Sequence, residues 1–241
     1  MDESKLTPER KHLRPIASRI IRAKFTLEPR MPRLRQVPLA EATPEVAQMY
    51  ARLFGERDPV ASPGTATGTP GNWWTVFALV PEIFNSAVAQ FGMFSSPKRS
   101  LTPYQRELAL TRTGFAAGSQ FVFSQHSKAA RGAGILEDKL AAIPSWASAE
   151  VFDPQDRAIL AYTDDLILAD GRVQEPTFER LKSFLSDEAI LELTFAVCTY
   201  RLHATMCRAL QLEYDEVPER IVEIAAPAGA ATDVMRQISR D

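Results

Sequence analysis

Hydrophobic residues along this chain recur every three or four positions, the spacing that places them on one face of an α-helix. No segment sustains the alternation of apolar and polar residues, with β-branched enrichment, that is typical of strands. The clearest helical stripes are Val46, Met49, Tyr50 and Leu53; Ala158, Ile159, Tyr162, Leu166 and Ile167; and Ile190, Leu191, Leu193, Phe195, Ala196 and Val197. The pattern predicts an all-α protein, a compact helical domain of about seven to eight helices built round a central helical hairpin.

Capping residues and prolines set the predicted helix boundaries. Thr43, Thr102 and Asp153 each precede a proline, which fits the first helical position because its missing N–H costs nothing there. Helices are expected from about residue 44, from 72 with an interruption near 81, and over about 104–117, 119–133, 136–142, 153–169, 176–185 and 186–212. Residues 55–71, rich in Gly, Pro and Thr, form the only long loop. A loop of that length is usually a functional lid or a disordered segment.

The segment 102–135 is the part around which the rest of the chain is organised. It reads as two helices joined at Gly118-Ser119, and Gly134 is the residue type that ends a helix most cheaply. Glu107 lies on the first helix and His126 on the second, so folding of the hairpin could bring them together. A histidine held by a carboxylate is a general acid or base. In the alternative interpretation, the acid is solvated and the histidine is a hydrogen-bonded core residue.

The hairpin carries several residues in a fixed register: Arg106-Glu107-Leu108, then His126 at 19 residues after the glutamate, then Ala129-Ala130 and Gly134. This arrangement resembles the carboxymuconolactone decarboxylase family, which includes the alkylhydroperoxidase D-like proteins. The family's usual form is R-E-L, a cysteine seven residues before the histidine, an aromatic residue five before it, and A-x-x-x-G after it. The spacing of Asn72 and Pro81 also matches the N…P pair that the family shows ahead of its hairpin.

Two chemically important positions depart from the family's pattern. Ser119 stands where the family has its first cysteine, while Phe121 keeps the aromatic position. Val122 stands where the peroxidase branch has a second cysteine and the decarboxylase branch commonly has a glutamate. A thiol peroxidase needs one thiolate to attack the peroxide and a second thiol to resolve the sulfenic acid. The resemblance therefore points to the decarboxylase-like branch and disfavours a thiol peroxidase.

The resemblance also has implications for organisation and partners. It implies a helical domain over residues 32–217, with a pocket against the hairpin, in a homo-oligomer that is a trimer or a multiple of three. Residues 1–31 would be a basic N-terminal arm, and residues 218–241 a polar, alanine-rich tail with little to pack.

Residues 1–35 hold ten Lys or Arg and four Asp or Glu, whereas the remainder of the chain holds 18 Lys or Arg and 26 Asp or Glu. A basic arm can bind nucleic acid or membrane. We expect neither partner, because the body has no basic aromatic motif, and favour contact with an acidic neighbouring subunit.

The sequence contains only two cysteines, Cys198 and Cys207. Nine positions along a helix correspond to about 900°, so these side chains should lie on opposite faces, unable to share a disulfide or a metal ion. No early apolar run fits a signal peptide, and no stretch approaches about 20 apolar residues. We therefore expect a cytoplasmic protein that uses no metal and no cofactor.

Further residues are candidates for binding a substrate. Asn72, Trp73 and Trp74 directly follow the long loop, where the indoles could wall a pocket, although either indole could equally be a core residue. Ser119 could hydrogen-bond a substrate oxygen or simply cap its helix. Phe123 belongs to the apolar run 121–123.

The last long helix contains a faint echo of the hairpin, with Glu192 followed by His203 at a different spacing. His203 is therefore included among the candidate substrate-binding residues. A buried, hydrogen-bonded histidine is the default expectation for it.

We expect a small-molecule lyase in which His126 is the general acid/base and Glu107 orients it. The resemblance implies decarboxylation of a lactone or other unsaturated carboxylic acid, in which an acid delivers a proton to the carbon left behind. One alternative is an isomerase, dehydratase or cyclase of a specialised pathway that uses the same pair. Another is a non-enzymatic scaffold that binds a small apolar ligand. Enzyme and scaffold differ in whether a Glu107 oxygen reaches a His126 ring nitrogen beside an open cavity.

Overall fold

The computed structural model describes residues 31–215, 221–230 and 233–238, and these are helical with no strand among them. The α-helices are α1 (Pro44–Phe54), α2 (Asn72–Phe77), α3 (Pro81–Phe94), α4 (Pro103–Ala116), α5 (Gln120–Gly132), α6 (Glu137–Ala142), α7 (Pro154–Ile167), α8 (Glu175–Lys182), α9 (Asp187–Leu210) and α10 (Val234–Ile238). Short 3₁₀ segments lie at Leu39–Glu41 and Ile143–Ser148. The all-α prediction is confirmed, and most predicted boundaries hold within a few residues.

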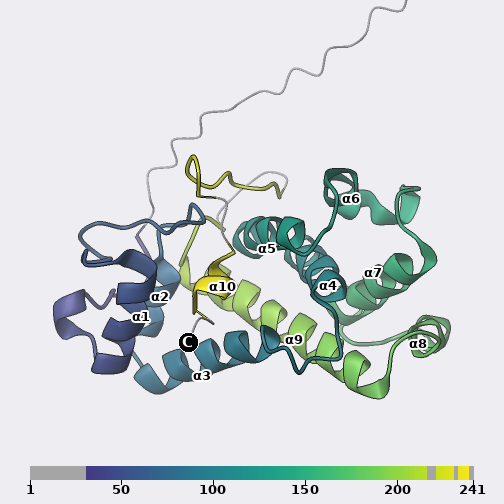
Figure 1. The fold of residues 1–241 in the computed structure, drawn as a ribbon, viewed down its shortest axis with the longest axis horizontal. Helices are drawn as coiled ribbons and strands as arrows, with labels where there is room; N and C mark the ends of the chain where they lie inside the picture. Colours follow the sequence, from purple (N-terminus) through teal and green to yellow (C-terminus); the bar gives the residue numbers. More distant parts are fainter. Residues whose placement is uncertain (1–30, 216–220, 231–232, 239–241) are drawn as a thin grey trace, which may run out of the picture.

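The central hairpin forms as the capping residues predict. Thr102 caps α4 through a capping box with Gln105, and Pro103 occupies the first turn. Gly118 turns the chain with a φ of 65°, and Ser119 caps α5 by accepting a hydrogen bond from the Val122 N–H. Together these residues fold α5 back against α4, and Figure 1 shows the pair at the centre of the molecule.

Gly114 sets the separation between α4 and α5. A Cβ atom at this position would lie 2.3 Å from the backbone nitrogen of Phe123 and 2.6 Å from its Cα, so only glycine permits this approach. Glu107 precedes Gly114 by two helical turns and therefore lies on the same face of α4. His126 follows Phe123 by about one turn on α5. The close crossing thus brings the carboxylate and the imidazole to the same side of the interface.

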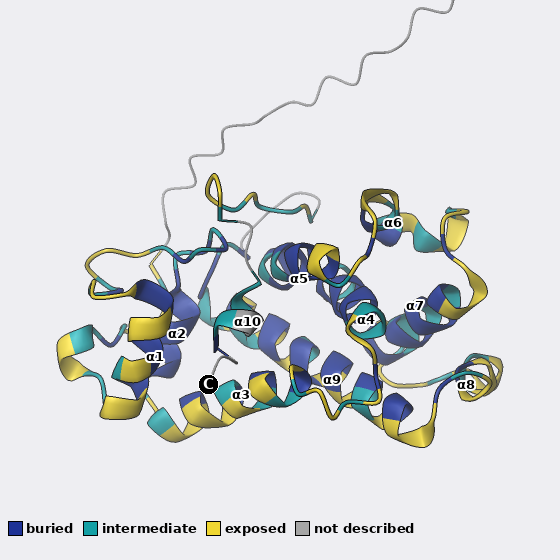
Figure 2. Ribbon diagram, in the orientation of Figure 1, coloured by how far each residue is buried: buried dark blue, intermediate teal, exposed yellow. Residues whose placement is uncertain are grey.

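The long helix α9 joins two hydrophobic cores. Figure 1 shows it running alongside the hairpin, with α1, α2 and α3 at one end and α7 and α8 at the other. Tyr200, Ala204 and Cys207 pack in the core formed with α1–α3, whereas Leu193 and Val197 pack in the core formed with α4, α7 and α8. Buried positions line the facing sides of these helices, while α8 is largely exposed (Figure 2).

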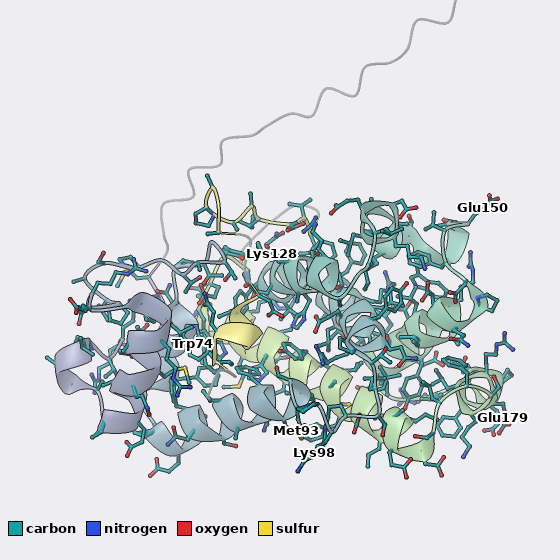
Figure 3. The ribbon with its side chains drawn as sticks, viewed as in Figure 1. Trp74, Met93, Lys98, Lys128, Glu150 and Glu179 are labelled. Carbon is teal, nitrogen blue, oxygen red and sulfur yellow. The ribbon has the colours of Figure 1, made fainter. Side chains whose placement is uncertain are left out.

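The prediction of a C-terminal tail with little to pack is wrong for the part that the structure describes. Residues 221–224 run along α5, where Ile224 accepts hydrogen bonds from Ser124 Oγ and Lys128 Nζ. Farther on, α10 packs against α1 and α3, and Ile238 is buried. Figure 3 labels Lys128 on α5 beside this segment. Polar backbone contacts, which have no hydrophobic period, hold the segment, so helical pattern analysis could not detect them. The basic arm, residues 1–31, lies outside the described residues except for Met31.

Two carboxylates directly after α9 tie this turn to the starts of other helices. Glu213 is buried and accepts hydrogen bonds from the N–H groups of Trp73 at 2.8 Å and Gly71 at 3.4 Å. Asp215 accepts hydrogen bonds from the Ser119 hydroxyl at 3.0 Å and the Phe121 N–H at 2.8 Å. Burial raises the pKa of Glu213 to about 8 and also raises the pKa of Asp215. These contacts fix α2 and α5 relative to the end of α9.

Among the described residues, none of the helices combines the length and the apolar character needed to cross a membrane.

Replacing Gly114 by Ala should force α4 and α5 apart and lower the free energy of unfolding by about 3 kcal/mol or more, because the added methyl group meets backbone atoms. Gly92→Ala is the matched control: Gly92 lies on α3, and a Cβ there meets nothing within 4 Å. It should leave stability unchanged or raise it by up to about 1 kcal/mol. Urea denaturation followed by circular dichroism measures both variants. Equal stability of the two would show that the hairpin contact is not tight.

Replacing Glu213 by Gln should flatten the dependence of stability on pH between about 4.5 and 8. In this window the folded protein keeps a proton on Glu213, whereas the unfolded chain has lost it. Wild-type stability should therefore fall as pH rises, by up to about 1.4 kcal/mol per pH unit from this group. Glutamine can still accept the Trp73 N–H but cannot ionise. Urea midpoints at pH 5 and pH 8 test this, and parallel pH profiles for the two proteins would contradict it.

Candidate active site

A buried hydrogen bond joins the two residues that the sequence singled out. The Oε2 atom of Glu107 lies 2.7 Å from Nδ1 of His126. Both residues are buried, at 3% and 4% exposed. The hydrogen bond connects α4 to α5 near the Gly114 crossing. The alternative of a solvated acid and an unrelated core histidine therefore does not describe this pair.

Glu107 is held in its ionised form by two neighbours. Arg106 Nε donates to its other oxygen, Oε1, at 2.9 Å, while Arg106 Nη1 is fixed by the Phe94 carbonyl at 2.7 Å. Burial on its own would raise the pKa of Glu107, but His126 and Arg106 outweigh burial and hold this pKa below its ordinary value. An ionised carboxylate only accepts hydrogen bonds. It therefore selects the tautomer of His126 with the proton on Nδ1, which leaves Nε2 for other partners.

His126 lines a cavity between α2, α5, α9 and α10, with an interior volume of about 50 Å³, which is room for a few water molecules. The lining is mostly apolar and aromatic, with a few polar groups. The lining residues are Thr65, Thr67, Thr69, Trp73, Trp74, Phe91, Phe121, Val122, Gln125, His126, Ala129, Tyr200, His203, Asp233 and Val234. No lysine or arginine lines this cavity, so the described wall offers an anionic ligand no countercharge.

One aromatic ring lies against the imidazole of His126, and further rings continue across the cavity. The ring of Tyr200 lies edge-on to the ring of His126, with centroids 4.2 Å apart. His203 is next, 5.8 Å from Tyr200 and 5.0 Å from Phe91. Trp73 stacks on Phe77. The ring centroid of Trp73 lies 5.7 Å from that of His203. Figure 3 labels Trp74, the second indole in this wall, on α2.

The long loop supplies the most polar part of the wall. Thr65 Oγ1 lies 2.8 Å from the hydroxyl of Thr69 and 3.2 Å from that of Thr67, and all three residues are buried. The segment 225–226 packs against this loop, since a Cβ at Gly68 would lie 2.8 Å from the Ala225 carbonyl. The loop is therefore an ordered part of the cavity wall.

The structure brings some of the predicted substrate-binding residues to the cavity and places others away from it. Trp73, Trp74 and His203 line the cavity together with His126. The described lining contains none of Asn72, Ser119 or Phe123.

Each of these three residues has a structural position instead. Asn72 is buried at the start of α2, and Ser119 caps α5 and donates to Asp215. Phe123 faces the core on the other side of α5 and contacts Phe115 edge-on. Position 123 is three residues before His126, but the side chain at 122 is the one that reaches the cavity.

His203 is buried as expected, but the expected hydrogen bond is not found among the described residues. Neither of its ring nitrogens has a hydrogen-bond partner among the described residues, although His203 is only 4% exposed. Burial, and then the proximity of His126, lowers the pKa of His203 to about 4. His203 is therefore a neutral imidazole at neutral pH, with one donor and one acceptor beside the cavity.

The cysteines lie outside this site, on opposite faces of α9 as predicted. Cys198 is exposed and Cys207 is buried, and both are free thiols. Burial, with Asp215 and Glu213 nearby, holds the pKa of the Cys207 thiol well above its usual range. Among the described residues, no cluster of three or more His, Cys, Asp or Glu side chains could hold a metal ion.

Sequence analysis missed several parts of the site. Tyr200 carries no motif, and only its place one turn before His203 on an apolar helix could have suggested it. The three loop threonines alternate at positions 65, 67 and 69, and this alternation was the only sequence feature that could have indicated their place in the wall. Asp233 and Val234 lie in the segment that was expected to pack little.

Comparison with known protein families gives one match, and it includes the hairpin. Residues 82–165 match the carboxymuconolactone decarboxylase family, which confirms the resemblance read from the hairpin. No curated protein is significantly similar to the chain in sequence.

Solved structures of low sequence identity share the fold. An uncharacterized peroxidase-related protein with an alkylhydroperoxidase AhpD core, from Ralstonia eutropha, has a TM-score of 0.62 at 18% sequence identity. The alignment covers 76% of this chain and 92% of the Ralstonia chain. A putative antioxidant defence protein AhpD from Agrobacterium tumefaciens has a TM-score of 0.50 at 22% identity, with 61% and 96% covered. The debrominase Bmp8 has a TM-score of 0.54 at 14% identity, with 81% and 92% covered.

At these identities the likeness establishes the fold alone, and the family match supports a catalytic role on a small molecule. The matched region contains α4, α5, the Gly114 crossing and the hydrogen-bonded pair. Residues 82–165 of this chain, which include Glu107 and His126, are therefore similar to the carboxymuconolactone decarboxylase family.

Proposed function

We propose that this protein is a cofactor-independent acid/base enzyme that transfers a proton to or from a small, largely apolar substrate. His126 is the catalytic residue and Glu107 is the positioning residue. The observation that carries this proposal is the 2.7 Å hydrogen bond between them beside an aromatic cavity. A scaffold that only binds an apolar ligand would not need a buried, ionised carboxylate paired to an imidazole, since burying such a pair is costly.

The roles of the groups follow from their chemistry. The Glu107 carboxylate holds the proton on Nδ1, so that Nε2 of His126 can take a proton from a substrate carbon or oxygen. The carboxylate then stabilises the imidazolium that forms. The same nitrogen can return the proton at a neighbouring atom of the substrate. Arg106 keeps the carboxylate ionised and oriented and has no contact with the cavity among its described hydrogen bonds.

The charge of the cavity wall bears on the kind of reaction. Among the described residues that line the cavity, Asp233 is an acid and none is a lysine or an arginine. An uncharged unsaturated substrate suits such a wall better than a polycarboxylate, because a buried carboxylate without a countercharge is strongly disfavoured. This favours isomerisation, dehydration or cyclisation.

Decarboxylation of an unsaturated monocarboxylic acid is the second candidate, and the family match favours it. An apolar wall could assist the loss of carbon dioxide because the charge spreads over the unsaturated system as the carboxylate leaves. A panel of unsaturated lactones and ketones, and the corresponding monoacids, distinguishes the two. Deuterium incorporation without gas release indicates isomerisation, and carbon dioxide release indicates the lyase.

With any substrate found in this way, His126→Ala and Glu107→Gln should each lower kcat by about 10²–10⁴-fold and change substrate binding much less. The double variant should be little slower than His126→Ala, because groups that act as one unit are lost together. Steady-state kinetics measures both, with circular dichroism as a control for folding. A double variant that keeps the wild-type rate would refute the mechanism.

A thiol peroxidase is not supported, because neither Cys198 nor Cys207 lines the cavity. The Cys207 thiol is buried and protonated, and so a poor nucleophile.

Replacing both cysteines, Cys198→Ser with Cys207→Ala, should leave kcat within about twofold of wild type. The expected cost is about 1–3 kcal/mol of stability from the space left at Cys207. Turnover of the panel substrates and a urea denaturation curve test this. Loss of turnover in a folded double variant would place the chemistry at a thiol.

A further inference from the structure

His203 is a polar cavity residue that the proposed reaction does not use, and its ring nitrogens lack a hydrogen-bond partner among the described residues. It lies on α9, and its ring is surrounded by the rings of Trp73, Phe77, Phe91 and Tyr200 at centroid distances of 5.0 to 6.2 Å. Both ring nitrogens are buried, and neither has a partner among the described residues. Burying a polar group without a hydrogen bond is costly. A phenylalanine would fill the same space among these rings at no such cost.

The surroundings of His203 restrict what could satisfy it. The imidazole is neutral because burial lowers its pKa to about 4, so it presents one N–H donor and one nitrogen acceptor and no positive charge. A neutral donor–acceptor suits a hydroxyl or a ring N–H. It gives a carboxylate little compensation, and Asp233 in the same wall disfavours an anion further.

The geometry around His203 favours a flat ligand. The walls consist largely of aromatic rings, which stack on or meet edge-on the faces of unsaturated rings. On α5, the small apolar side chains of Val122 and Ala129 line the cavity together with Phe121, Gln125 and His126. A small unsaturated ring is larger than the interior volume of about 50 Å³, so the lining side chains must move apart to admit it. Once admitted, it could lie between the indoles and α5 with one polar substituent toward His203 and a reacting atom toward His126.

We propose that His203 is a specificity-determining residue that binds the hydroxyl or N–H group of a small, uncharged, unsaturated ring compound. The inference rests on the proposed function, because it names the class of molecule on which the Glu107–His126 pair acts. The two histidines divide the work: His126 moves a proton, and His203 fixes the ring by its polar substituent. The ring of Tyr200 contacts both imidazoles, with centroids 4.2 Å from His126 and 5.8 Å from His203.

Phenol, toluene and benzoate test this inference, because they share a ring and differ in the substituent that His203 would meet. Their dissociation constants can be measured by tryptophan fluorescence, since Trp73 and Trp74 line the cavity. Wild-type protein should bind phenol more tightly than toluene and should not bind benzoate at concentrations that saturate with phenol. His203→Phe should weaken phenol binding about tenfold or more, as loss of one hydrogen bond predicts. Toluene binding should change by no more than about twofold.

Two further measurements make the result specific. The sequence has three histidines, so long-range ¹H–¹⁵N spectra of their rings can be resolved individually. Phenol should shift the ring nitrogens of His203, and toluene should not. His203→Gln, which restores a donor and an acceptor, should recover part of the preference for phenol, and circular dichroism checks that both variants fold.

The outcomes separate this inference from the proposed mechanism. Glu107→Gln should keep the phenol preference and the His203 signal even though it loses turnover. If His203→Phe keeps the wild-type ratio of phenol to toluene affinity, or if phenol leaves the His203 signal unchanged, the inference is wrong and the imidazole is satisfied by water alone. A retained phenol preference with no turnover of any uncharged substrate would overturn the mechanism and leave the binding role intact.

Discussion

The structure depends on how closely α4 and α5 approach each other at Gly114. Because residue 114 has no side chain, the backbone of Phe123 lies against it, and the helices cross at a separation that no larger residue allows. Glu107, two turns before the crossing on α4, and His126, three residues after it on α5, then meet at hydrogen-bond distance. The long helix α9 lies along the hairpin and contributes Tyr200 and His203 to the same space. A wider hairpin would separate Glu107 from His126 and move His126 away from the rest of the cavity wall.

Electrostatics explains why the pair is stable when buried. A carboxylate in this position would be strongly destabilised alone, and neither His126 nor Arg106 by itself satisfies both of its oxygens. Arg106 is in turn held by the Phe94 carbonyl at the end of α3, so the orientation of the carboxylate depends on the α3–α4 connection as well. Glu213 and His203 differ from this pair, because burial without an opposite charge favours their neutral forms. One small domain thus contains both an ionised site and neutral polar groups.

The sequence predicted those parts of the fold and site that depend on local chemistry. Capping residues such as Thr102 and Ser119, and the glycines that end helices, act within a few residues of themselves, so the hairpin and its two central side chains could be placed. Ser119 was assigned to the site by its position seven residues before His126, and Phe123 by its place in the apolar run 121–123. Neither feature says which face of α5 meets the cavity. The contacts of Ile224, Glu213 and Asp233 could not be predicted, because they join positions far apart in the chain through backbone and carboxylate groups that leave no periodic pattern.

The cavity wall is assembled from segments that are distant in sequence, whereas the reacting pair lies within one hairpin of about thirty residues. Substitutions in the threonine loop, in α10 or around His203 can therefore reshape the space that a ligand meets without altering the spacing that pairs Glu107 with His126. Ligand binding by the wall and proton transfer by the Glu107–His126 pair can therefore vary independently. A lineage that kept the hairpin could exchange one ligand for another by changing the remote segments alone, and directed evolution could follow the same route by restricting mutagenesis to those walls.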